Sequence, residues 1–449
     1  MHRDLAQVHR VPHHGKTLVY APLQGFAALV NGTAATEIER LQRGELEAAT
    51  SPLVAALVSR LADRPTTPPR PRTGPFAPRQ LGVLPTNDCH LECQYCAPAV
   101  PAPFRAVMSA AVCVAAVDLY AGVAAREGFR SLVAYYFGGE PLLAFERVRL
   151  AQRTLRSHAD RLGIPAWAAC ATSGVLPAAH ARWAARHLAF AQVSMDGPAE
   201  IHDRTRPGAE GRATHARVVR TLRIFQEHSL PFALRCTVDT AAVERLPETA
   251  EYLCREFQPA FLDVEPVLEV GRCRERGLSA PDSNRFVRAF VAAGARARQH
   301  GVDMALSSAR PGRPTMSLCG VSDDNLVVAP DGTLSPCYTI NHGASPHASG
   351  LAFGHIDESG RVHLDDRAVA RARALATHLP PRCLTCFCRW HCAAGCRLFQ
   401  SPAECTDAPD WRCLVTRHLT VWKLLEQLHL PDEADRVAID EEEARRACA

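Results

Sequence analysis

Short apolar runs and longer helix-like segments alternate through the middle of the chain, between residues 80 and 312. Six runs rich in apolar and β-branched residues have the length of strands, at Leu81–Leu84, Leu132–Phe137, Ala166–Thr172, Phe190–Met195, Phe232–Val238 and Phe261–Val267. Alanine-rich segments with helical spacing follow them, at Ser109–Arg126, Phe145–Arg161, Pro177–His187, Ala213–His228, Ala241–Phe257 and Ser283–Gln299. This alternation predicts an α/β domain with a parallel sheet covered by helices. Chemically active residues should then follow the strands, because ligands bind at the carboxyl ends of the strands in such barrels.

Residues 1–64 precede this domain and predict a small α+β module. Strand-like runs at Thr17–Leu23 and Phe26–Val30 are followed by helices expected over Thr33–Gln42 and Pro52–Ala62. Residues 65–79 are dense in proline, which predicts an extended linker between the module and the barrel. At the other end of the chain, residues 426–449 are expected to form a charged helical tail.

Composition places the chain among globular proteins and directs attention to metal. Of 449 residues, 47% are hydrophobic and 22% are charged, and the net charge is only +4. No dense basic run suggests a nucleic-acid partner, and no apolar stretch is long enough to span a membrane. The first residues lack the apolar core of a signal peptide, so a cytoplasmic location is expected. The 18 cysteines are then expected to serve metal binding or chemistry rather than disulfides.

Three cysteines directly after the first strand carry the most information. Cys89, Cys93 and Cys96 have the spacing CxxxCxxC, which can hold three irons of a 4Fe–4S cube and leave the fourth iron open. Structural zinc or buried thiols are the alternatives, although structural zinc usually takes four ligands, commonly in CxxC pairs. The spacing, with Tyr95 before the last cysteine, resembles the signature of the radical S-adenosylmethionine (SAM) enzymes. The resemblance implies a partial (β/α)6 radical SAM barrel over residues 80–312, with SAM bound at the open iron.

Motifs after the next strands resemble further segments of this family. Gly138, Gly139, Glu140 and Pro141 match the family's GGEP segment, which binds the amino group of SAM. Thr172 belongs to a segment like the family's Thr-Asn-Gly, with Ser173 in place of Asn. Ser194 and Asp196 match a Ser-x-Asp-Gly segment that lies near the SAM ribose and carboxylate. Arg206 is a candidate partner of the SAM carboxylate, with a surface salt bridge as the alternative.

A second group of cysteines occupies the carboxyl third of the chain. Its spacing resembles the SPASM domain, a Cys-rich extension with two auxiliary clusters, here over residues 313–425. The resemblance implies one auxiliary cluster on Cys319, Cys337 and Cys396 and another on Cys383, Cys386, Cys392 and Cys413. The first of these clusters could keep an open iron or use Cys405 or Asp323. Cys388 is unassigned, and Cys113, Cys170, Cys236, Cys254, Cys273 and Cys448 are expected to be buried or incidental thiols.

The resemblance implies an oxidoreductase of the peptide-maturase type with SAM and three 4Fe–4S clusters. A reduced cluster would cleave SAM to a 5′-deoxyadenosyl radical, which abstracts hydrogen from a ribosomally made peptide and leads to a crosslink or thioether. The expected partners are a precursor peptide or protein and a reducing donor such as flavodoxin or ferredoxin. The N-terminal module resembles the small peptide-binding modules of such enzymes, and a simple packing extension is the alternative.

Two other functions remain open. The chain could be a protein oxidase like the anaerobic sulfatase maturases, or a non-catalytic Cys-rich metal-binding interaction protein. Sulfatase maturases carry, directly after the cysteine that matches Cys337, an Asp proposed as proton acceptor. Here that position is Tyr338, a poor base at neutral pH because an unperturbed phenol has a pKa near ~10. Tyr338 is therefore expected to pack, and no catalytic side chain is assigned.

Overall fold

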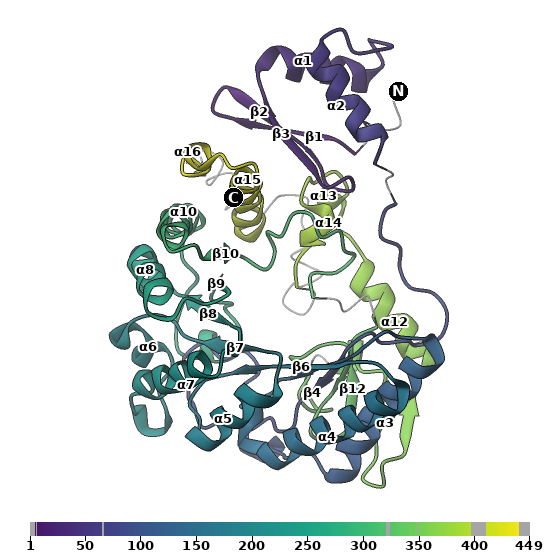
Figure 1. Ribbon diagram of the computed structural model, residues 1–449, viewed down its shortest axis with the longest axis vertical. Coiled ribbons are helices and arrows are strands. Elements are labelled where there is room, and N and C mark those ends of the chain that lie inside the picture. Colours follow the sequence, from purple (N-terminus) through teal and green to yellow (C-terminus); the bar gives the residue numbers. More distant parts are fainter. Residues whose placement is uncertain are drawn as a thin grey trace.

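The computed structural model of the protein describes residues 5, 7–64, 67–319, 324–346, 348–396 and 410–439, and its centre is a curved parallel sheet (Figure 1). Neighbouring strands of this sheet follow one another along the chain from β4 to β9, and every pair is parallel. The six strands are β4 (Leu81–Val83), β5 (Leu132–Tyr136), β6 (Ala166–Thr172), β7 (Phe190–Ser194), β8 (Phe232–Val238) and β9 (Phe261–Pro266). The predicted partial barrel is confirmed.

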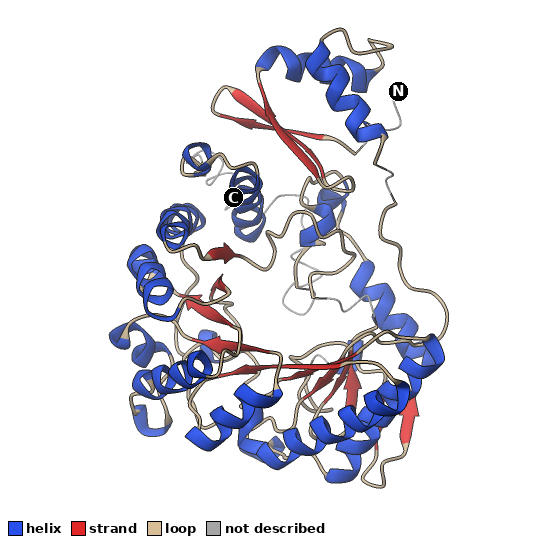
Figure 2. Ribbon diagram, in the orientation of Figure 1, coloured by secondary structure: helices blue, strands red, loops and turns tan. Residues whose placement is uncertain are grey.

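Helices connect these strands and cover the outer face of the sheet (Figure 2). All six predicted helices are present, and two shorter helices, α6 and α9, were not expected. The helices of this layer are α3 (Ala110–Glu127), α4 (Phe145–Leu162), α5 (Ala178–His187), α6 (Ala199–Thr205), α7 (His215–Glu227), α8 (Leu246–Phe257) and α10 (Ser283–Gln299). The short α9 (Arg272–Glu275) lies apart from them, beside the loop that contains Cys96. The buried faces of the helices in this layer and the strands share one large apolar core. This packing leaves the carboxyl ends of the strands open toward the other face.

The C-terminal region extends the barrel sheet, which the sequence did not predict. β10 (Asp303–Ala305) pairs with β9, and β11 (Leu326–Val328) pairs in parallel with β4 at the opposite edge. An antiparallel meander continues from β11 through β12 (Thr333–Ser335), β13 (Gly354–Ile356) and β14 (Val362–Leu364). Strands of three residues are too short to show an apolar alternation. Cys337 follows β12, and β11 alone separates β12 from β4, the strand that precedes the cysteine triplet.

The N-terminal module is a three-stranded antiparallel sheet with two helices. It comprises β1 (His9–His13), β2 (Lys16–Ala21), β3 (Phe26–Val30), α1 (Gly32–Arg43) and α2 (Pro52–Ala62). β1 was not predicted, because it contains Pro12, which is tolerated in an edge strand but hides the strand pattern. Alternate residues of β2 point to opposite faces: Val19 belongs to the module's own core and Tyr20 to the large core. The module is therefore packed on the rest of the protein.

Short helices and one long helix complete the C-terminal region. They are α11 (Ala348–Leu351), α12 (Asp366–Thr377), α13 (Pro381–Leu384), α14 (Arg389–Cys392), α15 (Trp411–Gln427) and α16 (Pro431–Ala434). The predicted helical tail is not continuous: α16 has four residues, and residues 435–439 are not helical. Residues 440–449 lie outside the described part. Among the described helices, none has both the length and the apolar composition that crossing a bilayer requires.

Candidate S-adenosylmethionine and iron–sulfur sites

The cysteine triplet lines a cavity of about 400 Å³ at the carboxyl ends of β4 to β8. The loops after four neighbouring strands contribute to its wall, as the barrel prediction requires. Six of the predicted cofactor-binding residues line it together with the three cysteines: Tyr95, Gly138, Gly139, Thr172, Ser194 and Arg206. Glu140, Pro141 and Asp196 do not line this cavity. The structure thus gathers most of the predicted site and places three of its members behind the wall.

The chemistry of the three thiols fits an iron–sulfur cluster. Burial, together with the charge of the neighbouring Cys93 thiolate, raises the pKa of Cys96 to about 11. Buried thiols that face one another stay protonated unless a metal supplies positive charge. Within the described residues, no three His, Cys, Asp or Glu side chains converge on a single metal ion. A cube does not need such convergence, because each thiolate binds a different iron.

Two glycines let the loop after β5 approach the loop that carries the cysteines. A Cβ at Gly138 would lie 2.3 Å from the carbonyl oxygen of Thr86, and one at Gly139 would lie 2.0 Å from that of Asp88. Gly138 also has φ +132°, a conformation that side chains disfavour. Backbone hydrogen bonds join the loops, since Gly139 N–H donates to Thr86 O at 3.1 Å. The glycines therefore hold the cysteine loop in place as well as lining the cavity.

Glu140 connects the ends of β5 and β6 from behind the cavity wall. Its carboxylate is fully buried and accepts hydrogen bonds from Thr172 Oγ1 at 2.9 Å and from both Ser173 N–H and Ser173 Oγ at 2.7 Å. These bonds satisfy the buried charge and fix the orientation of two hydroxyls at the cavity. Ser173, which departs from the family's Asn, makes two of the bonds. Glu140 is thus a support for the site.

Asp196 supports Tyr95 and Arg206 from behind the cavity wall, as Glu140 supports Thr172 and Ser173. Its carboxylate is buried and accepts from the Tyr95 hydroxyl at 2.5 Å, Thr205 Oγ1 at 2.6 Å and Thr237 N–H at 3.0 Å. Arg206 Nε lies 3.0 Å from it, and this guanidinium stands over the Tyr95 ring at 5.2 Å. Burial alone would raise the pKa of Asp196, but the Arg206 charge and the hydrogen bonds hold it below its usual value. Arg206 is therefore in a buried ion pair rather than the surface salt bridge considered from the sequence.

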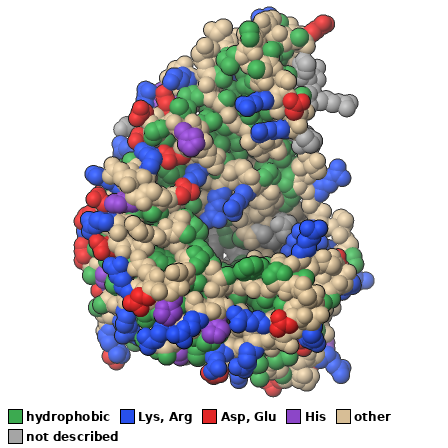
Figure 3. Space-filling model, viewed as in Figure 1, with side chains coloured by type: hydrophobic (Ala, Val, Ile, Leu, Met, Phe, Trp, Pro, Cys, Tyr) green, Lys and Arg blue, Asp and Glu red, His purple; other side chains and the backbone are tan. Residues whose placement is uncertain are grey.

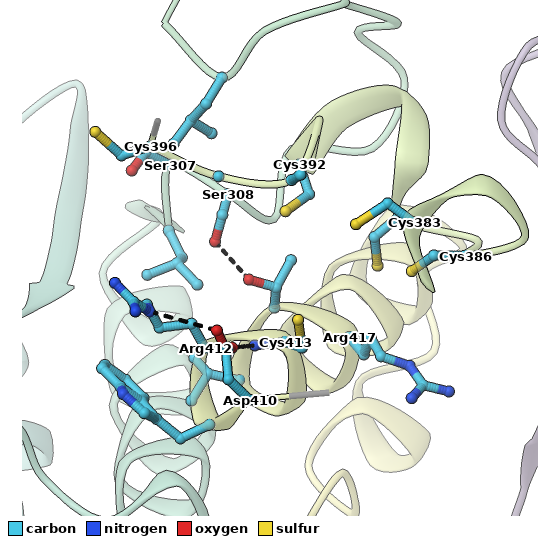
Figure 4. A pocket seen from close by; sticks show the side chains of 18 of the residues that line it. Ser307, Ser308, Cys383, Cys386, Cys392, Cys396, Asp410, Arg412, Cys413 and Arg417 are labelled. Atoms are coloured by element: carbon cyan, nitrogen blue, oxygen red, sulfur yellow. Dashed lines mark hydrogen bonds and ion pairs between the residues drawn. The ribbon is translucent and has the colours of Figure 1, made fainter. Parts of the chain in front are cut away.

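A second cavity, of about 280 Å³, is lined by the cysteines predicted to hold one auxiliary cluster. Figure 4 shows the sulfurs of Cys383, Cys386, Cys392 and Cys413 around one space, whereas the sulfur of Cys396 is directed away from it. Burial raises the pKa of Cys392, and the charges of Cys413, Cys386 and Cys383 add to this effect, as expected for adjoining thiols. The structure brings together the four cysteines of this predicted set. Cys388, which the sequence left unassigned, also lines the cavity.

The remaining predicted set is partly outside the described residues. Burial raises the pKa of Cys337, and the Cys396 thiolate adds to the shift, so these two thiols are neighbours. Cys319 and Cys337 both act on the Tyr338 hydroxyl electrostatically. Cys405 and Asp323, the two candidates for a further ligand, lie outside the described part of the chain. The five incidental cysteines that the structure describes are buried, as predicted: Cys113, Cys170, Cys236, Cys254 and Cys273.

Tyr338 packs, as its sequence context suggested. Its ring lies against Phe137 at 5.3 Å and Tyr135 at 5.6 Å, and it fills the space above Gly82, where a Cβ would come within 2.7 Å of the ring. Its hydroxyl accepts a hydrogen bond from Gln80 Nε2 at 2.8 Å. Burial raises the pKa of Tyr338 above the ordinary value, so an even smaller fraction of the side chain is the proton-accepting phenolate at neutral pH.

A charged group between the two cavities was missed by the sequence reasoning. Arg235, on β8, lines both cavities, and its Nη1 donates to the buried Asp263 at 2.6 Å. Gln192 Nε2 donates to the same carboxylate at 3.1 Å. Glu265, on β9, lines the second cavity and accepts a hydrogen bond from Ser307 N–H at 2.6 Å. Charged residues inside otherwise apolar central strands were the available signal, because such charges are rarely buried without a purpose.

Comparison with known proteins was made on sequence and on structure. No family model matches the chain. The serine-type anaerobic sulfatase-maturating enzyme of Klebsiella aerogenes is 25% identical over 280 residues, which are 60% of this chain and 67% of that protein. The cysteine-type anaerobic sulfatase-maturating enzyme of Clostridium perfringens is 23% identical over 293 residues, covering 60% of this chain and 75% of the relative.

Solved structures show the same fold at low sequence identity. The enzyme anSMEcpe with bound S-adenosylmethionine has a TM-score of 0.60 at 16% identity and covers 79% of this chain and 99% of its own. SuiB of Streptococcus suis, also bound to S-adenosylmethionine, has a TM-score of 0.50 at 14% identity over 87% and 94% of the two chains. Together these findings confirm the resemblance and the prediction of an enzyme: the chain is a homologue of the anaerobic sulfatase-maturating enzymes and has the fold of radical SAM maturases of the SPASM type.

Proposed function

We propose that the protein is a radical SAM enzyme that oxidatively modifies a ribosomally made precursor peptide, by formation of a crosslink or thioether. The observation that carries the proposal is the pair of adjoining cavities, one lined by the cysteine triplet and one by four further cysteines, with Arg235 in the wall of both. An enzyme that starts a reaction at one cluster and takes an electron away at another needs two such sites close together.

The residues of the first site would serve to bind and orient the cluster and SAM. Cys89, Cys93 and Cys96 would hold the first cluster, with SAM bound beside Gly138 and Gly139. When bound, SAM and the reduced cluster supply a 5′-deoxyadenosyl radical that takes a hydrogen atom from a substrate carbon. The backbone carbonyls of the two glycines can accept hydrogen bonds from the SAM ammonium group.

The residues behind the wall keep the lining residues in position. Glu140 fixes the hydroxyls of Thr172 and Ser173, and Asp196 fixes Tyr95 and Arg206. A cavity whose polar groups are already oriented loses little free energy when it orders a ligand. The protein would in this way hold a bound ligand in a fixed orientation.

The substrate would lie between the two cavities, beside Arg235. A guanidinium has five N–H donors, and one of the Arg235 donors is used by Asp263, so others can bind peptide carbonyl groups or a carboxylate. The face drawn in Figure 3 is hollowed between the barrel and the C-terminal elements, with Lys or Arg side chains beside the hollow.

The peptide assignment has support from two directions. One solved structure of SuiB contains its precursor peptide SuiA, and that structure has a TM-score of 0.50 with this chain. The N-terminal module, which has its own core, would offer an added surface for the peptide. Sulfatase maturation is the second candidate, because the sequence relatives carry that name. Tyr338 disfavours it, since the position of the expected carboxylate holds a buried phenol.

The test is incubation of the anaerobically reconstituted enzyme, with SAM and dithionite or a reduced flavodoxin or ferredoxin, and each short peptide encoded beside its gene. A mass loss of about two hydrogens in one peptide is expected, since this is what one net two-electron oxidation removes. Three clusters correspond to about 12 irons per chain, which iron analysis can count. Formation of formylglycine on a sulfatase peptide would instead establish the second candidate.

A further inference from the structure

Glu265 places a carboxylate in the wall of the second cavity, close to the first. It lies near the end of β9 and shares the wall with Arg235, which lines both cavities. Asp263 pairs with Arg235 in the strand register. Two residues further along, Glu265 pairs with Thr237 and points to the same face of the sheet. Because Thr237 lines the first cavity, Glu265 lies where the two cavities adjoin.

The carboxylate of Glu265 is hydrogen-bonded on one oxygen only. Its Oε1 accepts from Ser307 N–H at 2.6 Å and also from the Ser307 hydroxyl. Ser307 follows β10, which pairs with β9, and it lines the same cavity. Within the described residues, no donor is bonded to Oε2 of Glu265 and no cation forms an ion pair with the carboxylate. Ser307 thus fixes the side chain and leaves one oxygen available to a ligand in the cavity.

Two other carboxylates line the cavities in the described part of the chain, and both are engaged elsewhere. Asp88 accepts a hydrogen bond from Cys89 N–H at 2.9 Å in the loop that carries the cysteine triplet. Asp410 accepts from Cys413 N–H at 2.8 Å and caps α15. Both aspartates therefore hold backbone that carries a cysteine, whereas Glu265 supports no such segment.

The surroundings of Glu265 suit a proton acceptor. Burial raises the pKa of Glu265 above its usual value, and the charge of Asp263 adds to the shift, whereas Arg235 opposes it. A carboxyl group whose pKa lies closer to the operating pH is the better general base. Tyr338, at the position where sulfatase maturases carry an Asp, is a buried phenol bonded to Gln80. The acceptor that is missing at Tyr338 is thus available on β9.

We propose that Glu265 is the general base of the oxidation and takes up the proton that the substrate releases. The proposal rests on the proposed function. In that reaction one substrate carbon gives a hydrogen atom to the 5′-deoxyadenosyl radical, and a second substrate group, such as a thiol, loses its proton to Glu265 as the new bond forms. The electron that remains leaves to an auxiliary cluster, so the substrate loses two hydrogens in total. Oxidation to formylglycine also releases a proton, so the same base would serve the second candidate function.

The experiment quantifies 5′-deoxyadenosine and oxidised peptide in the same reactions of the full-length, reconstituted enzyme. The peptide is the one that the wild type oxidises, chosen from the short peptides encoded beside the gene and a sulfatase peptide. The test variants are Glu265→Gln and Glu265→Ala, each with and without added formate. The controls are Tyr338→Phe and Glu227→Gln, which is exposed at the end of α7. Iron content is measured for every variant.

Glu265→Gln should retain iron and still form 5′-deoxyadenosine, because hydrogen abstraction precedes the proton transfer. The amount of oxidised peptide per 5′-deoxyadenosine should fall about a hundredfold, which is the effect of losing a general base. Formate should partly restore this ratio in Glu265→Ala, where the truncated side chain leaves room for a carboxylate, and should not restore it in Glu265→Gln. Both controls should keep the wild-type ratio.

An unchanged ratio in Glu265→Gln at full iron content would overturn the proposal. Loss of iron from both Glu265 variants would also overturn it, as would an equal fall of both products that formate does not relieve, since Glu265 would then serve only the structure of the cavity. If the wild type cleaves SAM but oxidises none of the peptides, the proposed function fails, and the step assigned to Glu265 fails with it.

Discussion

Replacing Asp196 with asparagine should weaken both the fold and the SAM site, although Asp196 does not line the cavity. The carboxylate is 1% exposed and holds Arg206 at 3.0 Å and the Tyr95 hydroxyl at 2.5 Å. Asparagine has nearly the same shape but no charge. Arg206, which is 8% exposed, would then be a buried cation without its carboxylate.

The size of the effect follows from the buried ion pair. Removing one partner of such a pair destabilises proteins by about 3–5 kcal/mol, because the other charge remains buried. Asparagine keeps one acceptor oxygen for Thr237 N–H or Thr205 Oγ1, so we expect about 3 kcal/mol in the free energy of unfolding. Loss of the fixed positions of Tyr95 and Arg206 should weaken SAM binding about tenfold, which is ~1.4 kcal/mol.

Two measurements and one control variant separate the loss of stability from the loss of SAM affinity. Urea unfolding of the metal-free protein reports stability, and equilibrium dialysis of the reconstituted protein reports SAM affinity. Asp324→Asn is the matched control, because Asp324 is also buried and pairs with Arg373 at 2.5 Å, away from the residues that line the SAM cavity. It should lose comparable stability and keep its SAM affinity. If Asp196→Asn lost stability but bound SAM as tightly as the wild type, our account of Asp196 would be refuted.

Three further predictions concern the same region. Gly139→Ala should abolish cluster binding, measured as iron content, because its Cβ would lie 2.0 Å from Asp88 O; Gly122→Ala, with open space on α3, should bind iron normally. Tyr338→Phe should keep peptide oxidation within a few fold, and a loss of more than a hundredfold would show that the hydroxyl takes part in catalysis. The pKa of Asp196 is lower in the folded protein, so its stabilisation is present above the unfolded pKa and is lost as pH falls through the folded value. The stability difference between wild type and Asp196→Asn should therefore shrink below about pH 4, the ordinary carboxyl range.

The barrel was predictable because its strands and helices are long and strongly patterned. All six strands and all six helices of the barrel appear close to their predicted bounds, since tertiary packing reinforces their local pattern. The strands β10 to β14 were not predictable in this way. Each has three residues, too few to show an alternation, and β10 and β11 join the sheet by pairing with β9 and β4, which are distant in sequence. The same holds for β1, where Pro12 interrupts the pattern.

The candidate site was predictable by position more than by role. The motifs after the strands do converge on one cavity. The four carboxyl cysteines assigned to one cluster surround the second cavity, which Cys396 also lines with its sulfur directed away, and the two ligand sets stay a prediction. Spacing alone could not show that Asp196 lies behind the wall, because that depends on the packing of Tyr95 and Arg206. Arg235 escaped notice since no motif contains it, and only the meeting of the two cavities gives it significance.

One arrangement recurs around the SAM cavity and explains why its residues are sensitive as a group. Glu140, Asp196 and Asp263 are each at most 1% exposed and do not line this cavity, yet each binds residues that do. Asp263 holds Arg235 at 2.6 Å as Asp196 holds Arg206 at 3.0 Å. The two aspartates thereby neutralise the guanidinium groups of Arg206 and Arg235, which a ligand with a carboxylate would also contact. Replacing any of these three carboxylates should therefore weaken ligand binding through the lining residue that it holds, although the lining residues themselves are unchanged. Returning the negative charge behind the wall should restore the binding.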